Sequence, residues 1–426
     1  MSMARPLSRL VRLAALILVP VLLAASVPAF AKGIVEKGDR IVVVGDSITE
    51  QKIYSRFIED YVTMCTPELD VRVIQLGWSG ETAPGFLGRM NQDLIPFKPT
   101  VVTTCYGMND GGYRAYDDGI GKRYLDAMKQ IVENLKKIGA TVVIGSPGAV
   151  DTGTWRGPAD VYNDNLNHLK ELDRQLAAAE GMPFADVHGL MIEVMKKAKA
   201  AYGPQFPVCG GDGVHPSADG QLVMAQAFLK TFGVSGDIGT FTVDLAGEAT
   251  ATEGHKVLSW RGGTVEIESR RYPFCFYGDE KSPDSPRSIL PFLAFNEDLN
   301  RLTLVVRNLK ADQARVTWGK TAKTFTRQEL AKGVNLAAEF FDNPFSDAFK
   351  KVDDEVAKKQ QFETFLIKEC YRLLGGIERQ LGDDAETAAA ARTIRAKLLA
   401  RHDALAKAVR DAVTPVRHSI TISEEN

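Results

Sequence analysis

Strand-like and helix-like segments alternate five times between residues 41 and 232, and this alternation limits the fold more than any other feature. The strand-like runs are rich in β-branched residues. Apolar residues in the intervening segments recur at three- and four-residue steps, the spacing of a helix with one buried face. We therefore predict a parallel sheet with helices on both faces. The strands are expected at 41–44, 71–76, 100–106, 141–145 and 183–187, and the helices at 51–65, 83–94, 120–138, 161–180, 190–201 and 218–232.

The pattern changes after Gly233, where short strand-like runs separated by turn residues replace the alternation. These runs predict a small β-rich module, or extra strands added to the main sheet. They lie at 241–245, 257–260, 264–267, 302–306 and 315–318.

Helical signals return at Thr326 and Glu329, which make a capping box. Two longer helices are expected over 347–374 and 384–413, the first ended by Gly375-Gly376 and the second by Pro415. The whole chain is thus predicted to have four segments. These are a signal peptide (1–31), an α/β domain (32–236), a β-rich accessory segment (237–325) and a C-terminal helical segment (326–426).

An apolar stripe runs along the last expected helix, among many charged residues, and a stripe of this kind predicts burial. It would pack against the preceding helix, with Phe365, Leu366, Leu373 and Leu374 opposite, or against another copy of the chain. The stripe consists of Ile394, Leu398, Leu405, Val409 and Val413.

The first 31 residues have the organisation of a secretory signal peptide. Three arginines precede the apolar run 13–25, and Ala29-Phe30-Ala31 supplies small residues at cleavage spacing. The run is short for a membrane span, so an uncleaved anchor is the weaker alternative. We predict cleavage near Ala31, a secreted or periplasmic protein, and no transmembrane anchor after cleavage.

Composition excludes some classes of partner and cofactor. The 426 residues carry a net charge of −2, which leaves no electrostatic footprint for nucleic acid. Five cysteines are too few and too widely spaced for a zinc motif or a disulfide scaffold, and their odd number leaves at least one thiol unpaired. No acidic pair has a metal-ligand context either. We therefore predict no metal and no cofactor.

The first strand-like run ends abruptly in Gly45-Asp46-Ser47, ahead of a helix-like segment. Open α/β sheets place their chemistry at this point, between the carboxyl end of a strand and the N-terminus of a helix. Ser47 is therefore a candidate nucleophile. The alternative is an ordinary turn, with Gly45 chosen for its backbone freedom and the serine for helix capping.

A serine nucleophile needs an imidazole base and a carboxylate that orients it. Of six histidines, His215 is the candidate base because Asp212 precedes it by three residues in a glycine-rich loop. A compact loop of this kind can turn both side chains into one crevice. The alternative is a plain helix N-terminus with Ser217 as its cap.

Hydrolysis of an ester also needs hydrogen-bond donors for the oxyanion. Gly77 follows the second strand, where its backbone N–H can face the crevice, and Asn109 follows the third with a side-chain amide. Each is an ordinary turn residue by itself. Four loops thus follow one another along the chain. They supply the nucleophile, a first oxyanion donor, a second oxyanion donor and the acid–base pair, in that order.

These four blocks resemble those of the SGNH hydrolases, also called the GDSL-like lipase and acylhydrolase family, over about residues 39–232. The matching stretches are Gly45-Asp46-Ser47, Gly77-Trp78-Ser79-Gly80, Gly107-Met108-Asn109-Asp110 and Asp212-Gly213-Val214-His215-Pro216. The resemblance implies a flavodoxin-like three-layer α/β/α sandwich. It also implies Ser47 as nucleophile, His215 as base, Asp212 as its orienting acid, and an oxyanion hole of the Ser47 and Gly77 amides with Asn109. Nothing after Phe232 belongs to the family pattern.

The expected activity is that of an exported serine esterase on a small-molecule or carbohydrate ester, with short acyl groups such as acetyl as the first choice. A lipase or lysophospholipase is the alternative within the family, and an inactive secreted binding protein is the alternative outside it. Tyr113, Arg114, Trp155 and Arg156 lie in loops that can line the cleft.

Overall fold

The computed structural model describes Met1, residues 33–381 and residues 384–425, and Gly33–Asn426 form one compact unit. The expected signal peptide lies, apart from Met1, outside the described residues and stays a prediction. Within the described ranges, no helix has the length and apolar character needed to cross a membrane.

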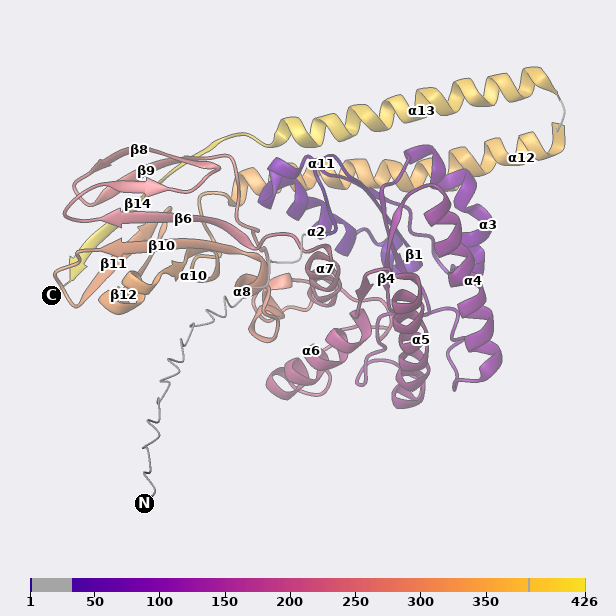
Figure 1. Cartoon of the computed structure of the whole chain (residues 1–426), viewed down its shortest axis with the longest axis horizontal. Coiled ribbons are helices and arrows are strands. Elements are labelled where there is room, and N and C mark those ends of the chain that lie inside the picture. The colour runs from indigo at the N-terminus through magenta and orange to yellow at the C-terminus, as the bar shows by residue number, and fades with distance from the viewer. Residues whose placement is uncertain (2–32, 382–383, 426) are drawn as a thin grey trace. The chain divides into compact units, whose positions relative to one another are not determined.

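A five-stranded, fully parallel sheet forms the centre of the N-terminal half (Figure 1). Its strand order is β2-β1-β3-β4-β5, which is the flavodoxin-like order. All five expected strands are confirmed, with β5 shorter than predicted. They are β1 (Arg40–Gly45), β2 (Arg72–Gln75), β3 (Val101–Cys105), β4 (Thr141–Gly145) and β5 (Phe184–Ala185).

Both faces of this sheet are buried under helices, which confirms the three-layer α/β/α prediction. Along β1, Ile41 and Val43 enter one apolar cluster, while Val42 and Val44 enter the other, as expected for side chains that alternate along a strand. The first cluster includes α2 (Tyr54–Asp60), α6 (Val187–Tyr202) and α7 (Ala218–Phe232); the second includes α3 (Ala83–Asp93) and α4 (Asp118–Lys137); α5 (Ala159–Glu180) contributes to both.

The remaining strands build two separate sheets, so they are not additions to the central one. One sheet has the order β13-β10-β6-β7 and the other, called sheet C below, the order β12-β11-β14-β9-β8. Their bounds are β6 (Asp237–Asp244), β7 (Ala249–Ala251), β8 (His255–Arg261), β9 (Thr264–Ser269), β10 (Arg301–Arg307), β11 (Gln313–Trp318), β12 (Thr321–Thr326), β13 (Val334–Asn335) and β14 (Val416–Glu425).

Strand β14 was missed by the sequence analysis, which ended its assignments at Pro415. A period-two pattern is present, since His418, Ile420 and Ile422 are buried and alternate with more exposed residues. The C-terminal segment is therefore not wholly helical, because its last strand joins β9 to β11.

The C-terminal half also contains three short helices and a long helical hairpin. The capping box at Thr326 is confirmed and opens α9. The bounds are α8 (Phe295–Leu299), α9 (Arg327–Lys332), α10 (Leu336–Glu339), α11 (Ser346–Phe365), the π-helical η6 (Leu366–Tyr371), α12 (Arg372–Leu381) and α13 (Ala385–Ala412).

The prediction that Gly375-Gly376 ends a helix is wrong. Figure 1 shows α11, η6 and α12 as one continuous helix, which ends at Leu381. Gly375 is buried, and a Cβ at this position would lie 2.2 Å from Oε1 of Gln92 on α3. The glycine thus allows close packing, which offsets the roughly 1 kcal/mol that glycine costs a helix interior.

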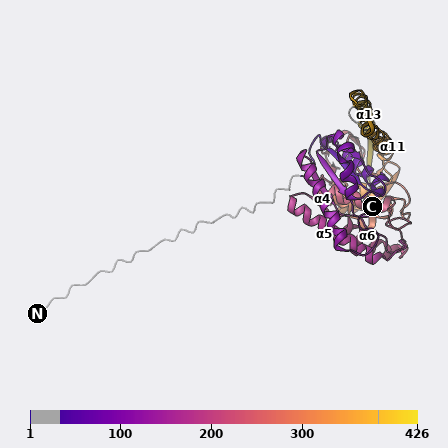
Figure 2. The same ribbon diagram turned by 90° about the vertical axis from the view of Figure 1, so that its right-hand side faces the viewer.

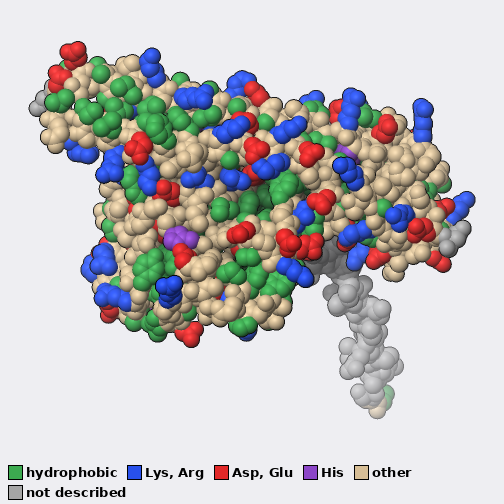
Figure 3. Space-filling view, turned by 180° about the vertical axis from the view of Figure 1, so that it is seen from behind, with side chains coloured by type: hydrophobic (Ala, Val, Ile, Leu, Met, Phe, Trp, Pro, Cys, Tyr) green, Lys and Arg blue, Asp and Glu red, His purple; other side chains and the backbone are tan. Residues whose placement is uncertain are grey.

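The predicted pairing of the two long helices is only partly correct. They lie side by side in Figures 1 and 2, and Val409 is buried. Leu366 and Leu374 are also buried, but Leu366 packs with the helices of the central sheet. The exposed fractions are 46% for Phe365, 64% for Leu373 and 45% for Ile394. Figure 3 shows hydrophobic side chains gathered over this hairpin.

Polar side chains of α11 complete the free edge of the central sheet at β2. Glu363 accepts a hydrogen bond from the backbone N–H of Gln75 at 2.9 Å, and Lys359 donates to the carbonyl of Val73 at 2.7 Å. Lys359 and Glu363 also pair with each other at 2.5 Å, and His402 of α13 lies 2.7 Å from Glu363. The C-terminal helices are thereby built into the folded α/β domain.

Candidate active site

Ser47 is the first residue of α1 (Ser47–Glu50), separated by Asp46 alone from β1, an inner strand of the sheet. Gly45 is needed for this tight passage, because a Cβ there would lie 2.1 Å from Oγ1 of Thr49. Asp46 caps the helix by accepting a hydrogen bond from the N–H of Ile48 at 2.9 Å. Burial, which disfavours the carboxylate, raises the pKa of Asp46 to about 7.

His215 and Asp212 lie in the loop before α7, and the loop is folded around the Asp212 carboxylate. Oδ1 accepts from the backbone N–H groups of Val214 and His215, each at 2.9 Å, while Oδ2 lies 2.7 Å from Nδ1 of His215. Burial acts to raise the pKa of Asp212, but these hydrogen bonds outweigh it and lower the pKa. Asp212 therefore stays ionised and orients the imidazole.

The nucleophile candidate and this loop meet at the sheet edge. Ser47 Oγ lies 2.7 Å from Nε2 of His215, so serine, histidine and aspartate form one hydrogen-bonded chain. With Nδ1–H donating to Asp212, Nε2 is left to accept the hydroxyl proton. The chain is open to solvent, since 36% of the His215 side chain and 57% of the Asp212 side chain are exposed.

Two backbone donors flank the serine. The N–H groups of Ser47 and Gly77 donate no hydrogen bond to any residue that the structure describes. Gly77 packs against the end of α1, where a Cβ would lie 2.4 Å from the backbone nitrogen of Glu50. A side chain here would push the Gly77 loop away from the nucleophile helix.

Asn109 supplies a third donor, and its amide is held from both ends. Nδ2 donates to the carbonyl of Glu81 at 3.0 Å, and Oδ1 accepts from the hydroxyl of Tyr113 at 3.1 Å. Burial is the main cause that raises the pKa of Tyr113 to about 12, so its hydroxyl keeps the proton that it donates. The second N–H of Asn109 has no partner among the described residues.

Comparison with known proteins agrees with this geometry. The sequence model of the GDSL-like lipase/acylhydrolase family matches residues 43–223, which include all five residues discussed as nucleophile, base, acid and donors. Residues 43–223 thus form a GDSL-like lipase/acylhydrolase domain. The chain is an ester-hydrolysing enzyme, as the sequence analysis predicts.

Two relatives each cover about half of this chain, the half that includes the GDSL-like domain. An acetylxylan esterase of Geobacillus stearothermophilus is 26% identical over 218 residues, which are 46% of this chain and 94% of that protein. The solved structure of a catalytic mutant of Axe2, an acetylxylan esterase from the same organism, matches 47% of this chain and 97% of its own. The identity is 23% and the TM-score 0.41.

A gut microbial diltiazem-metabolizing enzyme, BT4096, is similar over 92% of this chain and 98% of its own. Its TM-score is 0.74 at 23% identity. The likeness shows that the fold of the C-terminal half, and not only that of the GDSL-family domain, occurs in another solved structure.

Buried charged residues hold the loops of Gly77 and Asn109, and the sequence analysis missed their role. The Glu81 carboxylate accepts two hydrogen bonds from Arg89, each at 2.6 Å, and one from Tyr106 at 2.8 Å. Asp110 accepts from the N–H groups of Ala83 and Gly107, each at 3.0 Å. Asp110 could have been found from the sequence, because it belongs to the Gly107–Asp110 block that resembles the family. Glu81 could not, because only its long-range contacts show its role.

Asp151 holds the loop of His215 and was also missed. Its N–H donates to the carbonyl of Gly213 at 2.8 Å, and its fully buried carboxylate accepts from the N–H of Cys209 and pairs with Lys199 at 2.6 Å. These partners are far apart in sequence, so no local spacing could have revealed them.

Aromatic residues lie beside the open site. Tyr113 is exposed, and its ring stacks on Tyr162 with centroids 5.0 Å apart, while the half-buried Trp155 lies 5.5 Å from Tyr162. Trp155 also contacts the loop of His215, since a Cβ on Gly213 would lie 2.4 Å from the Trp155 backbone. Of the four predicted cleft residues, Tyr113 and Trp155 thus contact the site loops.

The other histidines and the cysteines take no part in this arrangement. His188 is buried and hydrogen bonds to the carbonyl of Gly148, and His168 stacks on Tyr116 at the surface of α5. All five cysteines are described, and none is in a disulfide. No group of three or more metal-binding side chains occurs in the described ranges.

Proposed function

We propose that this chain is an exported serine esterase that removes short acyl groups, such as acetyl, from carbohydrate through an acyl-enzyme. The observation that carries the chemistry is the hydrogen-bonded chain of Ser47, His215 and Asp212, with 2.7 Å at each link. Family membership supplies ester hydrolysis. The acyl-enzyme, the substrate and the export are the proposed parts.

In the first half of the reaction, Ser47 Oγ attacks the ester carbonyl carbon while Nε2 of His215 takes the hydroxyl proton. The imidazolium that forms is stabilised by the Asp212 carboxylate. As the tetrahedral intermediate collapses, His215 returns this proton to the departing alcohol oxygen. The alcohol leaves, and the acyl group remains on Ser47 as an ester.

In the second half, water replaces the alcohol. Nε2 of His215 takes a proton from water as the oxygen of that water attacks the acyl carbon. The intermediate then collapses, the bond between the acyl carbon and Ser47 Oγ breaks, His215 returns the proton to Oγ, and the carboxylic acid leaves. In both halves the negative carbonyl oxygen would lie among the N–H groups of Ser47 and Gly77 and the Asn109 amide. In the described chain the two backbone N–H groups have no partner, and the Asn109 amide has one N–H left beside the bond to Glu81, which supports their assignment.

Three observations support a carbohydrate ester. The matching Geobacillus relative is named an acetylxylan esterase. The acid–base pair is open to solvent, so a bulky, hydrated alcohol can approach it. Tyr113 and Trp155 offer apolar ring surfaces beside the site, on which the C–H face of a sugar ring can pack.

Export is proposed from the basic and apolar organisation of residues 1–31. N-terminal sequencing of the protein recovered outside the cytoplasm tests it. A mature chain that still begins at Met1 would contradict cleavage near Ala31.

A panel of p-nitrophenyl esters from C2 to C12 tests the acyl length. We expect kcat/KM to be highest for the acetyl ester. In a second assay, we expect the enzyme to release acetate from acetylated xylo-oligosaccharides. A preference for C8 or longer chains would contradict the acetyl assignment and favour the lipase or lysophospholipase alternative.

Asn109→Ala tests the oxyanion assignment. Loss of one preorganised donor is expected to lower kcat on p-nitrophenyl acetate by roughly 10²–10³-fold with little change in KM. Steady-state kinetics on this ester, with thermal unfolding as the check on folding, give both values. A rise in KM at unchanged kcat would show uniform substrate binding and overturn the assignment.

A further inference from the structure

The nucleophile helix and the loop of Gly77 are tied together by Glu50, the last residue of α1. Its Oε2 accepts hydrogen bonds from both the backbone N–H and the hydroxyl of Ser79, at 2.5 and 2.6 Å. Ser79 follows Gly77 by two residues. Backbone bonds from Leu76 and Trp78 join the loop to β1, at Val43 and Gly45, and the Glu50 carboxylate adds the tie between Ser79 and the helix of Ser47.

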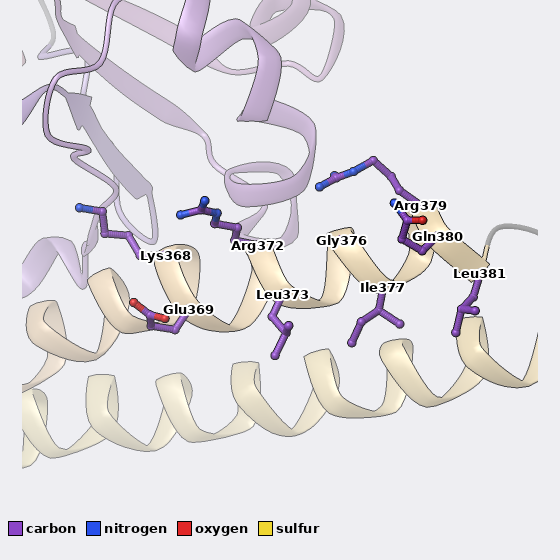
Figure 4. Close-up of a pocket in the computed structure, with 9 residues that line it drawn as sticks. All are labelled: Lys368, Glu369, Arg372, Leu373, Gly376, Ile377, Arg379, Gln380 and Leu381. Carbon is purple, nitrogen blue, oxygen red and sulfur yellow. The ribbon is translucent and has the colours of Figure 1, made fainter.

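Glu50 is held by a residue from far outside the family domain. Nζ of Lys368, in η6, lies 2.6 and 2.8 Å from the two carboxylate oxygens of Glu50. Only 26% of the Lys368 side chain and 18% of the Glu50 side chain are exposed, so solvent screens this pair less than a surface pair. Figure 4 shows Lys368 and Arg372 pointing from the helix toward the α/β domain, whereas Leu373 and Ile377 point away from it.

Lys368 also contacts the Gly77 loop directly. Its ammonium lies 5.1 Å from the ring centroid of Trp78, within the range of a cation–π interaction. A second cation, Arg89, lies 5.2 Å from the same ring and donates to the carbonyl of Leu76 at 2.7 Å. The loop from Leu76 to Ser79 is thus held by one cation from the family domain and one from the C-terminal helix.

The charges around Glu50 agree with this arrangement. Burial acts to raise the pKa of Glu50, but hydrogen bonds from Lys368 and Ser79 outweigh it and lower the pKa. Lys52, which donates to the backbone carbonyl of Glu50, is the other cation nearby. The ionised carboxylate thus accepts the two Ser79 hydrogen bonds while both of its oxygens are bound by Lys368.

We propose that Lys368 is a positioning residue for the esterase reaction: through Glu50 and Trp78 it fixes the loop that presents the Gly77 N–H to the oxyanion. The inference rests on the proposed function, in which Ser47 is the nucleophile and Gly77 a donor. It assigns to the C-terminal helix, which lies outside residues 43–223, a part in the alignment of the catalytic centre.

The test is Lys368→Met in the full chain, with p-nitrophenyl acetate as substrate. We expect kcat to fall at least about tenfold with KM unchanged, because a donor displaced by even a fraction of an ångström stabilises the transition state less. Lys368→Arg, which keeps the charge and the donors, should restore most of kcat. Lys358→Met is the matched control, since Lys358 is exposed and, among the described residues, pairs only with Glu355.

A second pair of variants separates positioning from a general loss of stability. Glu50→Gln should lower kcat by a similar factor, and the double variant Lys368→Met/Glu50→Gln should lose no more than the larger single loss, as for residues that act as one unit. Should Lys368→Met fail to fold, Glu50→Gln carries the test. A kcat equal to that of the wild type in either folded variant, or a change confined to KM, would overturn the inference.

Failure of the proposed function gives a different result. If the wild-type chain were not labelled by a fluorophosphonate probe, or if Ser47→Ala kept its turnover, the nucleophile assignment itself would be wrong. If labelling and Ser47 dependence hold while Lys368→Met keeps full kcat, only the role of Lys368 is refuted.

Discussion

Ser47→Ala should reduce turnover of p-nitrophenyl acetate by roughly 10⁴–10⁶-fold, because the methyl group cannot attack the ester or form an acyl-enzyme. The fold should be unaffected, since the only side-chain hydrogen bond of Ser47 in the described chain is that to His215. Steady-state kinetics and the melting temperature by circular dichroism measure the two effects. A fluorophosphonate probe should label the wild type and leave Ser47→Ala unlabelled.

Two results would contradict this expectation in different ways. Turnover within tenfold of the wild type in Ser47→Ala would show that another group is the nucleophile. Absence of labelling in a folded wild-type sample, under conditions in which a control esterase reacts, would instead favour the secreted binding protein.

The second large effect is expected at Lys359, whose side chain is 1% exposed. Its ammonium pairs with Glu363 at 2.5 Å and with Glu59 at 3.2 Å, and donates to the carbonyl of Val73. Lys359→Met leaves two buried carboxylates without their cation, and such a loss typically costs about 3–5 kcal/mol. Urea unfolding at pH 7 should show a fall of this size in the free energy of unfolding.

Lys358→Met provides the control for this measurement as well. Lys358 is the neighbour of Lys359 on the same helix, and 63% of its side chain is exposed. Its replacement should change the free energy of unfolding by no more than about 0.5 kcal/mol. Equal effects of the two variants would show that the buried network does not hold α11 to the edge of the central sheet.

The sequence predicts the α/β half well because there local pattern and tertiary role agree. The side chains of Ile41–Val44 are all apolar, and each face of the sheet needs apolar residues, so the run itself indicates a central strand. The site loops follow strands of that sheet, and parallel strands end at a common edge. Ser47, Gly77, Asn109 and the loop of His215 could therefore be expected near one another.

The C-terminal half was harder to predict because long-range contacts override local signals there. Gly375 stops no helix, and it lies inside a continuous helix where it packs against the side chain of Gln92. Leu373 points toward α13, as predicted, but Phe365 and Leu373 stay 46% and 64% exposed, so the predicted pairing buries them only in part. Glu81, Asp151 and Lys368 act through partners that no spacing in the sequence connects to them.

The place of β14 within sheet C determines when this half of the molecule can finish folding. It is the last strand of the chain and the middle strand of its sheet, flanked by β9 and β11. His418 of β14 contacts Ser269 and Trp318, which precede it by 149 and 100 residues. Contacts of such high sequence separation form slowly, because long loops must close first.

Until β14 arrives, β8–β9 and β11–β12 are two separate hairpins, each with an unpaired edge. Sheet C therefore closes only after β14 has been synthesised, and until then the inner edges of both hairpins stay open to pairing with other strands.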